Sequence, residues 1–158
     1  MRQALLDGLV LLAALGAGLV AGIFFAFSNF VMRALARLPA AQGIAAMQSI
    51  NVTVLNPLFL GLFVGTALLC AVLAGYGALH VTQPGSVWMI AGGLSYLLGN
   101  LAVTRICNIP RNEALARLSP VSAEAESAWR EYLSGWNFWN HVRTVTAFVA
   151  SAAFWLAR

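Results

Sequence analysis

The chain has 158 residues, of which 61% are hydrophobic and only 9% are charged, and its mean hydropathy is +0.82. Because about a quarter of the residues in soluble domains are charged, this composition excludes an ordinary soluble protein and predicts an integral membrane protein. The net charge of +4 comes from nine arginines against five acidic residues. The arginines flank apolar stretches instead of forming one basic patch, which favours a role in membrane orientation over nucleic-acid binding.

Four apolar stretches are each long enough to cross a bilayer, which takes about 20 residues of helix. We therefore predict a single all-α transmembrane domain over residues 1–158, folded as a four-helix bundle. The first stretch is too long and too continuous for a cleaved secretory signal, so we expect it to be retained. The predicted spans cover about 5–30, 53–79, 87–107 and 136–157.

Small residues recur at four-residue spacing in the first two spans. They are Ala14, Gly18 and Gly22 in the first span and Gly61 and Gly65 in the second. Small side chains let helix backbones approach closely where lipid gives no hydrophobic drive for association. We expect these faces to pack within the bundle or between copies in a homo-oligomer.

The end of the first span is aromatic, with Phe24, Phe25, Phe27 and Phe30 close together. This cluster fits either an interfacial anchor or the wall of a pocket for a flat ligand. A polar connection follows it, and near its end Gln48 and Asn51 lie three residues apart, on one helix face. Asn56-Pro57 then predicts the start of the second membrane helix, with asparagine as N-cap and proline in the first turn.

The third span carries Tyr96, Asn100 and Thr104 at four-residue intervals. An asparagine inside a membrane helix needs a hydrogen-bond partner. This stripe is consistent either with interhelical hydrogen bonds that hold the bundle together or with part of a site. Cys70 and Cys107 have no recognisable metal or redox spacing, so we interpret them as buried, unreactive thiols.

An amphipathic surface helix is predicted before the fourth span. It starts near Ser119-Pro120, and Gly135 is expected to break it from the span that follows. Its apolar stripe should lie over the end of the bundle. The stripe comprises Val121, Ala125, Ala128, Trp129, Tyr132 and Leu133.

The richest concentration of chemical groups is the stretch from Trp129 to Arg143. Taken as a helix from Trp136 onward, it places six side chains within an arc of about 160°. They are Trp136, Asn137, Asn140, His141, Arg143 and Thr144. Polar groups at the mouth of a membrane helix are costly unless they face a cavity or each other. We therefore expect a catalytic or binding site, if the protein has one, in the stretch from Trp129 to Arg143.

The positive-inside rule predicts an orientation in the plasma (inner) membrane. With four spans the two longer connections lie on one side, which carries most of the arginines, so we expect these connections in the cytoplasm and both termini outside. Amide, aromatic and basic side chains from all four span ends gather on the same side, which predicts a site at the bundle mouth. The candidate site residues are Gln48, Asn51, Asn56, Asn108, Arg111, Asn112, Tyr132, Trp136, Asn137, Trp139, Asn140, His141 and Arg143.

Four segments together carry a family resemblance over nearly the whole chain. They are Phe24–Phe30, Met47–Asn51 with Asn56-Pro57, Asn108–Asn112 and Trp136–Arg143. In this order they resemble the anthrone oxygenase-like membrane proteins, once called domain of unknown function 1772. Members of that family in fungal polyketide pathways oxidise anthrones to anthraquinones with dioxygen, without an added metal or flavin. The resemblance thus implies a cofactor-free monooxygenase for a small aromatic, anthrone- or quinol-like substrate.

The resemblance also suggests roles for the candidate residues. An anthrone is a carbon acid whose enolate reduces dioxygen directly, so such an enzyme must mainly remove a proton and hold the anion. His141 is the expected base, because imidazole titrates near neutral pH. Hydrogen bonds to the oxyanion are expected from Arg111, Arg143, Asn108, Asn112 and Asn140. A flat ring would lie between Tyr132, Trp136 and Trp139.

No metal or haem is expected, and dioxygen would be the co-substrate. The polar cluster has one histidine, few carboxylates and no thiolate pair, whereas a transition metal usually takes three or four ligands. His80 should lie at the opposite membrane face from His141, which disfavours paired haem ligands. A different hypothesis is a non-catalytic membrane module that binds a lipid, a quinone or a partner subunit. A transporter would need an internal repeat or broken helices, and neither is evident.

Overall fold

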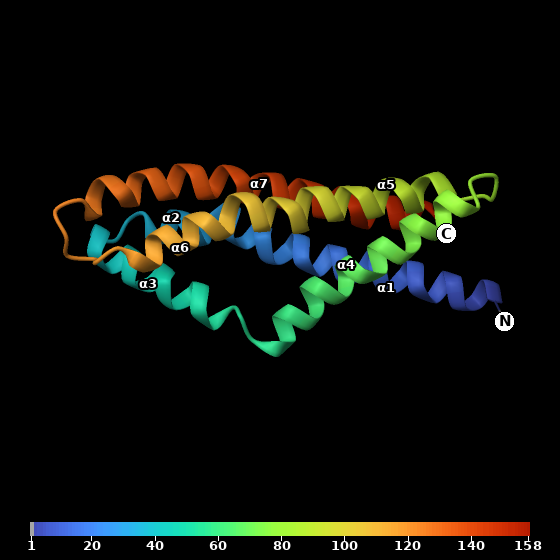
Figure 1. Ribbon diagram of the computed structural model, residues 1–158, viewed down its shortest axis with the longest axis horizontal. Coiled ribbons are helices and arrows are strands. Elements are labelled where there is room, and N and C mark those ends of the chain that lie inside the picture. The colour runs from blue at the N-terminus through green and yellow to red at the C-terminus, as the bar shows by residue number, and fades with distance from the viewer. Residues whose placement is uncertain (1) are drawn as a thin grey trace.

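A computed structural model describes residues 2–158, which are helical with no strand among them (Figure 1). The chain runs back and forth along the long axis, so the start of α1 and the end of α7 lie at the same end (Figure 1). The first long helix comprises α1 (Arg2–Ala26), the π-helical turn η1 (Phe27–Val31) and α2 (Met32–Leu35). α3 (Ala40–Thr53) and α4 (Pro57–Leu79) follow. The next long helix comprises α5 (Ser86–Tyr96), the π-helical turns η2 (Leu97–Ala102) and η3 (Thr104–Asn108), and α6 (Ile109–Arg117). The last helix is α7 (Ala125–Leu156).

Three helices in the described part of the chain are long and apolar enough to cross a membrane. They cover Gln3–Leu35, Pro57–Leu79 and Ser86–Arg117, and they identify the chain as a membrane protein. The first and third continue well beyond the spans predicted at 5–30 and 87–107. The predicted fourth span, 136–157, lies in α7, which is not among the three because polar side chains interrupt its apolar sequence.

The start of α7 differs from the prediction of a separate surface helix. α7 runs without interruption from Ala125 to Leu156, so Gly135 does not end a helix. A glycine inside a helix costs only about 1 kcal/mol relative to alanine. Here the missing side chain leaves room for Arg111, whose Nε would lie 2.9 Å from a Cβ at position 135. Gly135 therefore allows α6 to pack closely on α7 and does not mark a helix end.

α3 and α4 meet at a corner that points away from the other helices (Figure 1). The corner forms because Asn56 caps α4, as predicted. Its Oδ1 accepts a hydrogen bond from the Phe59 backbone N–H at 3.0 Å, and its Nδ2 donates to the Thr53 carbonyl at 3.0 Å. Pro57 occupies the first turn of α4, where its missing N–H leaves no helical bond unmade. The confirmed cap makes the change of direction sharp.

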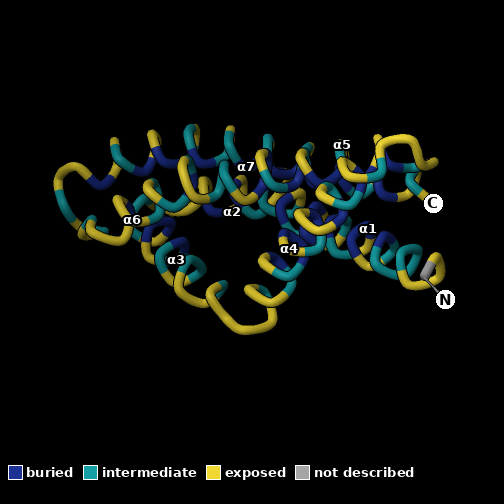
Figure 2. Tube along the Cα trace, turned by 45° about the vertical axis from the view of Figure 1, so that its right-hand side comes forward, coloured by how far each residue is buried: buried dark blue, intermediate teal, exposed yellow. Residues whose placement is uncertain are grey.

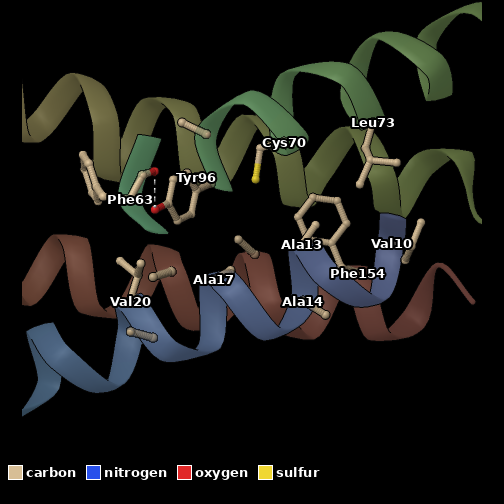
Figure 3. Packing of buried hydrophobic residues seen from close by; sticks show 14 of the residues in the cluster. Val10, Ala13, Ala14, Ala17, Val20, Phe63, Cys70, Leu73, Tyr96 and Phe154 are labelled. Carbon is tan, nitrogen blue, oxygen red and sulfur yellow. Dashed lines mark hydrogen bonds between the residues drawn. The ribbon is translucent and has the colours of Figure 1, made fainter. Parts of the chain in front are cut away.

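The core toward the termini is formed by α1, α4, α5 and α7 (Figure 3). Small side chains of α1 allow α7 to approach closely, and the Ser151 hydroxyl donates to the Ala14 carbonyl at 2.8 Å. The Tyr96 hydroxyl donates to the Phe63 carbonyl at 3.1 Å, the dashed line in Figure 3. A buried donor with a partner avoids the penalty of an unsatisfied polar group, so this bond ties α5 to α4.

A second core lies at the other end, where the helices extend beyond α4. Its members come from α2, α3, α6 and α7 and are Met32, Leu35, Ile44, Met47, Leu115, Ala125, Trp129, Tyr132 and Trp136. Gly43 allows α3 to pack flat on the Trp129 ring, since a Cβ there would lie 2.8 Å from it. The bundle therefore has two apolar cores in succession along its axis.

The predicted small-residue faces are only partly used inside the bundle. A Cβ on Gly18 would contact the Ser151 hydroxyl at 3.2 Å, which agrees with close packing of α1 on α7. Gly22, Gly61 and Gly65, by contrast, have no heavy atom within 4 Å of a built Cβ. Their spacing alone did not identify the contact positions, because neighbours differ around each helix.

Replacing Gly99 with alanine is expected to lower the free energy of unfolding by about 1–3 kcal/mol, the usual cost of overpacking. A Cβ at this position would overlap the Thr146 side chain of α7. The matched control is Gly61→Ala, which adds the same methyl group in open space and should leave stability equal or higher. Equal unfolding midpoints for the two variants in detergent would contradict the packing described here.

Candidate functional site

A layer of buried polar side chains lies where the two cores meet. Asn140 is its centre, and its Nδ2 donates to the Phe24 carbonyl and to the Ser28 hydroxyl, both at 2.8 Å. Its Oδ1 accepts from Arg143 Nη2 at 2.7 Å. The Thr144 hydroxyl lies 3.2 Å from that of Ser28. Asn140 thus joins α7 to the end of the first helix and orients the arginine.

Three π-helical turns flank this layer. η1 contains Ser28, while η2 and η3 contain Asn100 and Thr104 of the neighbouring helix. A π turn inserts one extra residue into a helix and re-aims the side chains around it, and such turns are frequent at functional sites. Helices α1 and α5 therefore depart from regular geometry where polar side chains converge on α7.

Arg143 is a buried cation, with its side chain only 5% exposed. Its Nη1 donates to the Thr104 hydroxyl at 3.2 Å, and its guanidinium carbon lies 4.1 Å from the Phe24 ring centroid and 5.3 Å from that of Trp136. Its Nε has no hydrogen-bond partner. Within residues 2–158 the ion pair found is Arg130–Glu126, on the exposed surface. Arg143 therefore has a positive charge and a free donor without a carboxylate partner.

Arg143 lines a cavity of about 530 Å³, within the usual size range of small-molecule sites. The cavity lies between the corner of α3 and α4 and the helices α1, α6 and α7. Its aromatic walls are Phe24, Phe27, Phe59, Phe63 and Trp136. Phe59 and Phe63 are parallel, with centroids 5.9 Å apart, and Phe27 lies 5.8 Å from Trp136. The arrangement suits a flat aromatic molecule with one anionic or strongly polar end near the guanidinium.

Five of the predicted site residues reach this cavity: Gln48, Asn51, Asn112, Trp136 and Arg143. The Nδ2 of Asn51 is buried without a hydrogen-bond partner, and the Asn51 amide lies beside the Tyr132 hydroxyl. The Oδ1 of Asn112 accepts from the Tyr132 hydroxyl at 2.9 Å. Gln48 has a structural role as well, because its Nε2 donates to two carbonyls at the end of α6.

Other predicted residues support the cavity wall from behind. Asn108 Nδ2 donates to the Trp136 carbonyl at 3.2 Å, and Arg111 Nη1 donates to the Cys107 carbonyl at 2.6 Å. Tyr132 stacks on Trp136 with centroids 6.2 Å apart. Burial raises the pKa of the Tyr132 phenol above its usual range, so the hydroxyl stays protonated and donates to Asn112. These side chains position the site without lining it.

The remaining predicted residues lie elsewhere. His141 is exposed on the outer side of α7 and is not part of the cavity wall. It follows Asn140 by one residue, about 100° around the helix, which turns the imidazole away from Arg143. Asn56 is exposed and acts as the cap of α4. Asn137 and Trp139 are partly buried on α7 and do not line the cavity.

Several wall residues were not among the predicted site residues. The sequence did not single out Phe59 and Phe63 among the many apolar residues of α4, and Phe63 packs against Phe24 of α1 in the structure. Thr104 was noted as one of a polar stripe, and the structure shows that it bonds to Arg143. Arg105 and Glu113 lie on the same wall, two helical turns apart. Their eight-residue spacing is a signal that could have placed both charges on one face.

Residues 2–158 contain no group of three or more histidine, cysteine or acidic side chains that could hold a metal ion. Cys70 is buried in the terminal core, and Cys107 is partly buried beside the polar layer. The cavity is lined by hydrogen-bonding side chains, by aromatic and aliphatic residues, and by the charged residues Arg105, Glu113 and Arg143.

The chain matches the family model described as anthrone oxygenase over residues 58–153, which is more than half of its length. The matched segment includes Thr104, Asn112, Trp136, Asn140 and Arg143, and so most of the polar part of the site. No curated protein and no solved structure matches the chain. By this match, and with an all-helical membrane fold around an aromatic cavity, the chain belongs to the anthrone oxygenase family.

Proposed function

We propose that this protein is a cofactor-free membrane oxygenase that oxidises an anthrone- or quinol-like aromatic with dioxygen. The observation that carries the proposal is the buried guanidinium of Arg143, which faces an aromatic cavity without a carboxylate partner. A cation held in a water-poor site stabilises charge that develops on a substrate oxygen. Family membership supports the same class of reaction.

The first step is removal of a proton from the acidic carbon opposite the substrate carbonyl. The electron pair left behind moves onto the carbonyl oxygen and gives an enolate, which the Arg143 guanidinium and Asn51 Nδ2 stabilise by hydrogen bonds. The aromatic walls hold the flat ring. Because Arg143 has no carboxylate to compete with, the enolate gains the full electrostatic interaction.

Glu113 is the proposed proton acceptor, since it is the carboxylate on the described cavity wall. The exposed His141 does not occupy that position. The enolate then transfers one electron to dioxygen, and the two radicals combine to form a peroxide at the reactive carbon. Glu113 returns its proton to the peroxide, and loss of water leaves a second carbonyl. The overall balance is one CH₂ group and one dioxygen converted to one C=O group and one water.

The direct test is turnover of anthrone by the purified protein in lipid nanodiscs under ¹⁸O₂. The expected product is anthraquinone with one ¹⁸O atom in the new carbonyl, formed without added metal or flavin. Chelator-treated protein should keep its rate. A rate no higher than that of nanodiscs without protein would contradict the proposal.

Glu113→Gln is expected to lower the kcat for anthrone about 100-fold, a typical contribution of a general base. The matched control is His141→Gln, which should change kcat by less than about twofold because the imidazole lies outside the cavity. Both side chains are exposed, so neither change should disturb folding. The reverse order of effects would identify His141 as the base and contradict the assignment to Glu113.

We also propose that the core near α3 and α6 faces the cytoplasm of a plasma membrane. Arg33, Arg37, Arg111, Arg117 and Arg130 gather at this end, and excess arginine marks cytoplasmic segments. Labelling of a Ser119→Cys variant from only the cytoplasmic side of sealed vesicles is the expected result. Labelling from only the outer side would contradict this orientation.

A further inference from the structure

The mouth of the cavity has one apolar lip at the corner of α3 and α4. Val52 and Leu55 line the cavity and are also 75% and 65% exposed at the surface. The corner is drawn as exposed chain in Figure 2. Leu60 and Val64 continue this lip along α4 and are exposed as well. The cavity therefore reaches the surface between large apolar side chains.

No charged residue occurs between Arg37 and Arg105, so α3, the corner and α4 are uncharged throughout. α4 is one of the helices long and apolar enough to cross the membrane, and Leu55 lies two residues before its start. An exposed apolar corner at the end of such a helix is stable in contact with lipid and costly in contact with water. This lip thus belongs at the edge of the hydrocarbon region.

The opposite lip is charged. Arg105 and Glu113 lie on the exposed side of η3 and α6 and also line the cavity. A mouth with one apolar lip and one charged lip fits the boundary between the hydrocarbon region and the headgroups. There the apolar lip contacts acyl chains and the charged lip contacts headgroups and water. Arg143 lies deeper, against the Phe24 and Trp136 rings.

We infer that the cavity opens sideways into the bilayer and takes its ligand from the lipid phase past Leu55. The inference rests on the site of the proposed function and names its substrate class: a flat aromatic that partitions into membranes and carries one ionisable oxygen. The ring enters between the corner of α3 and α4 and the charged lip. The ionisable end then meets Arg143 and Asn51, whose Nε and Nδ2, like Trp136 Nε1, have no hydrogen-bond partner at the cavity wall.

Cysteine labelling in nanodiscs tests where the lip lies. In a Cys107→Ser background, Leu55→Cys is expected to react with lipid-soluble N-cyclohexylmaleimide and to resist a disulfonated stilbene maleimide, which stays in water. Ser119→Cys, in the exposed turn between α6 and α7, is the control that both reagents should label. Equal labelling of positions 55 and 119 by the sulfonated reagent would overturn lateral access.

A matched pair tests whether ligands pass this lip. Leu58→Cys is the control, because Leu58 is 84% exposed near the same corner but does not line the cavity. The probe is anthracene-2-carboxylate, and its binding is measured by quenching of tryptophan fluorescence. The cyclohexyl adduct at position 55 should weaken binding about tenfold or more, whereas the adduct at position 58 should leave it unchanged.

The other possible results of the binding experiment also test lateral access and the ligand class. Unchanged binding with the adduct at position 55 would overturn access past this lip, and no binding to the unlabelled protein would overturn the ligand class. Failure of lateral access is distinguishable from failure of the proposed function. If the Leu55 adduct had no effect while Arg143→Gln abolished anthrone oxidation, the oxygenase would stand with an aqueous opening.

Discussion

Arg143→Gln is expected to lower the kcat for anthrone oxidation by about 100-fold or more, the usual effect of removing a donor aimed at a developing oxyanion. Glutamine keeps a polar side chain that can still bond to Thr104 or Asn140, but it has no charge. The enolate then loses its counter-ion in a cavity with aromatic walls, where water does not replace it. The rate of anthraquinone formation in nanodiscs measures the effect.

Stability separates this catalytic role from a structural one. An unpaired charge inside an apolar environment costs free energy, so its removal should leave the unfolding midpoint equal or raise it. Arg143→Lys keeps the charge without the planar fork and should retain part of the activity. A variant that lost stability but kept its rate would show that Arg143 holds the helices together and takes no part in the chemistry.

Asn140→Asp is expected to weaken binding of anthracene-2-carboxylate by about tenfold or more, because it would give Arg143 a permanent counter-ion. The Asn140 Oδ1 already lies 2.7 Å from Arg143 Nη2. Aspartate has nearly the same shape but cannot donate to the Phe24 carbonyl and the Ser28 hydroxyl as Asn140 Nδ2 does, so the unfolding midpoint of the variant is measured alongside its affinity. A carboxylate oxygen there would form an ion pair with the guanidinium and repel an anionic ligand. Tryptophan quenching measures the affinity.

The control for this charge is Asn137→Asp, which places the same carboxylate one turn earlier on α7. Asn137 does not line the cavity and has no contact with Arg143 among the hydrogen bonds of the described residues. Its variant should keep the affinity of the parent protein. Equal losses in the two variants would point to a general effect of charge on α7 and remove Arg143 as the anion-binding group.

Much of the fold could be predicted because its causes are local. Apolar length determined the membrane helices, and the Asn56-Pro57 pair identified the start of α4 from capping chemistry alone. Gly135 shows the limit of such reasoning, since this glycine leaves room for Arg111, which is distant in sequence, and does not end the helix. Spacing likewise suggested close packing at Gly61, either within the bundle or between copies, and the structure has open space there within one chain.

The structure brings some of the predicted site residues together around one cavity and places others elsewhere. Trp136, Asn140 and Arg143 lie on the inner face of α7, as the helical spacing indicated, while His141 sits at the edge of that arc and points outward. Two residues along α7, or about 200° around the helix, therefore separate the buried Arg143 cation from the exposed imidazole. Phe59 and Phe63 could not be assigned from the sequence, because their inward direction depends on how α4 packs on α1 and α5.

The π-helical turns allow the helix from α5 to α6 to hold extra residues without turning the segments that follow. η2 and η3 each hold one residue more than a regular turn would. Loss of a single residue within Leu97–Ala102 would therefore be absorbed by a return to regular winding. The same loss within the regular helix α5 would rotate the following residues by about 100°. Thr104, Arg105 and Glu113 would keep their directions in the first case and turn away from the cavity together in the second, so the position of a deletion in this helix decides its effect.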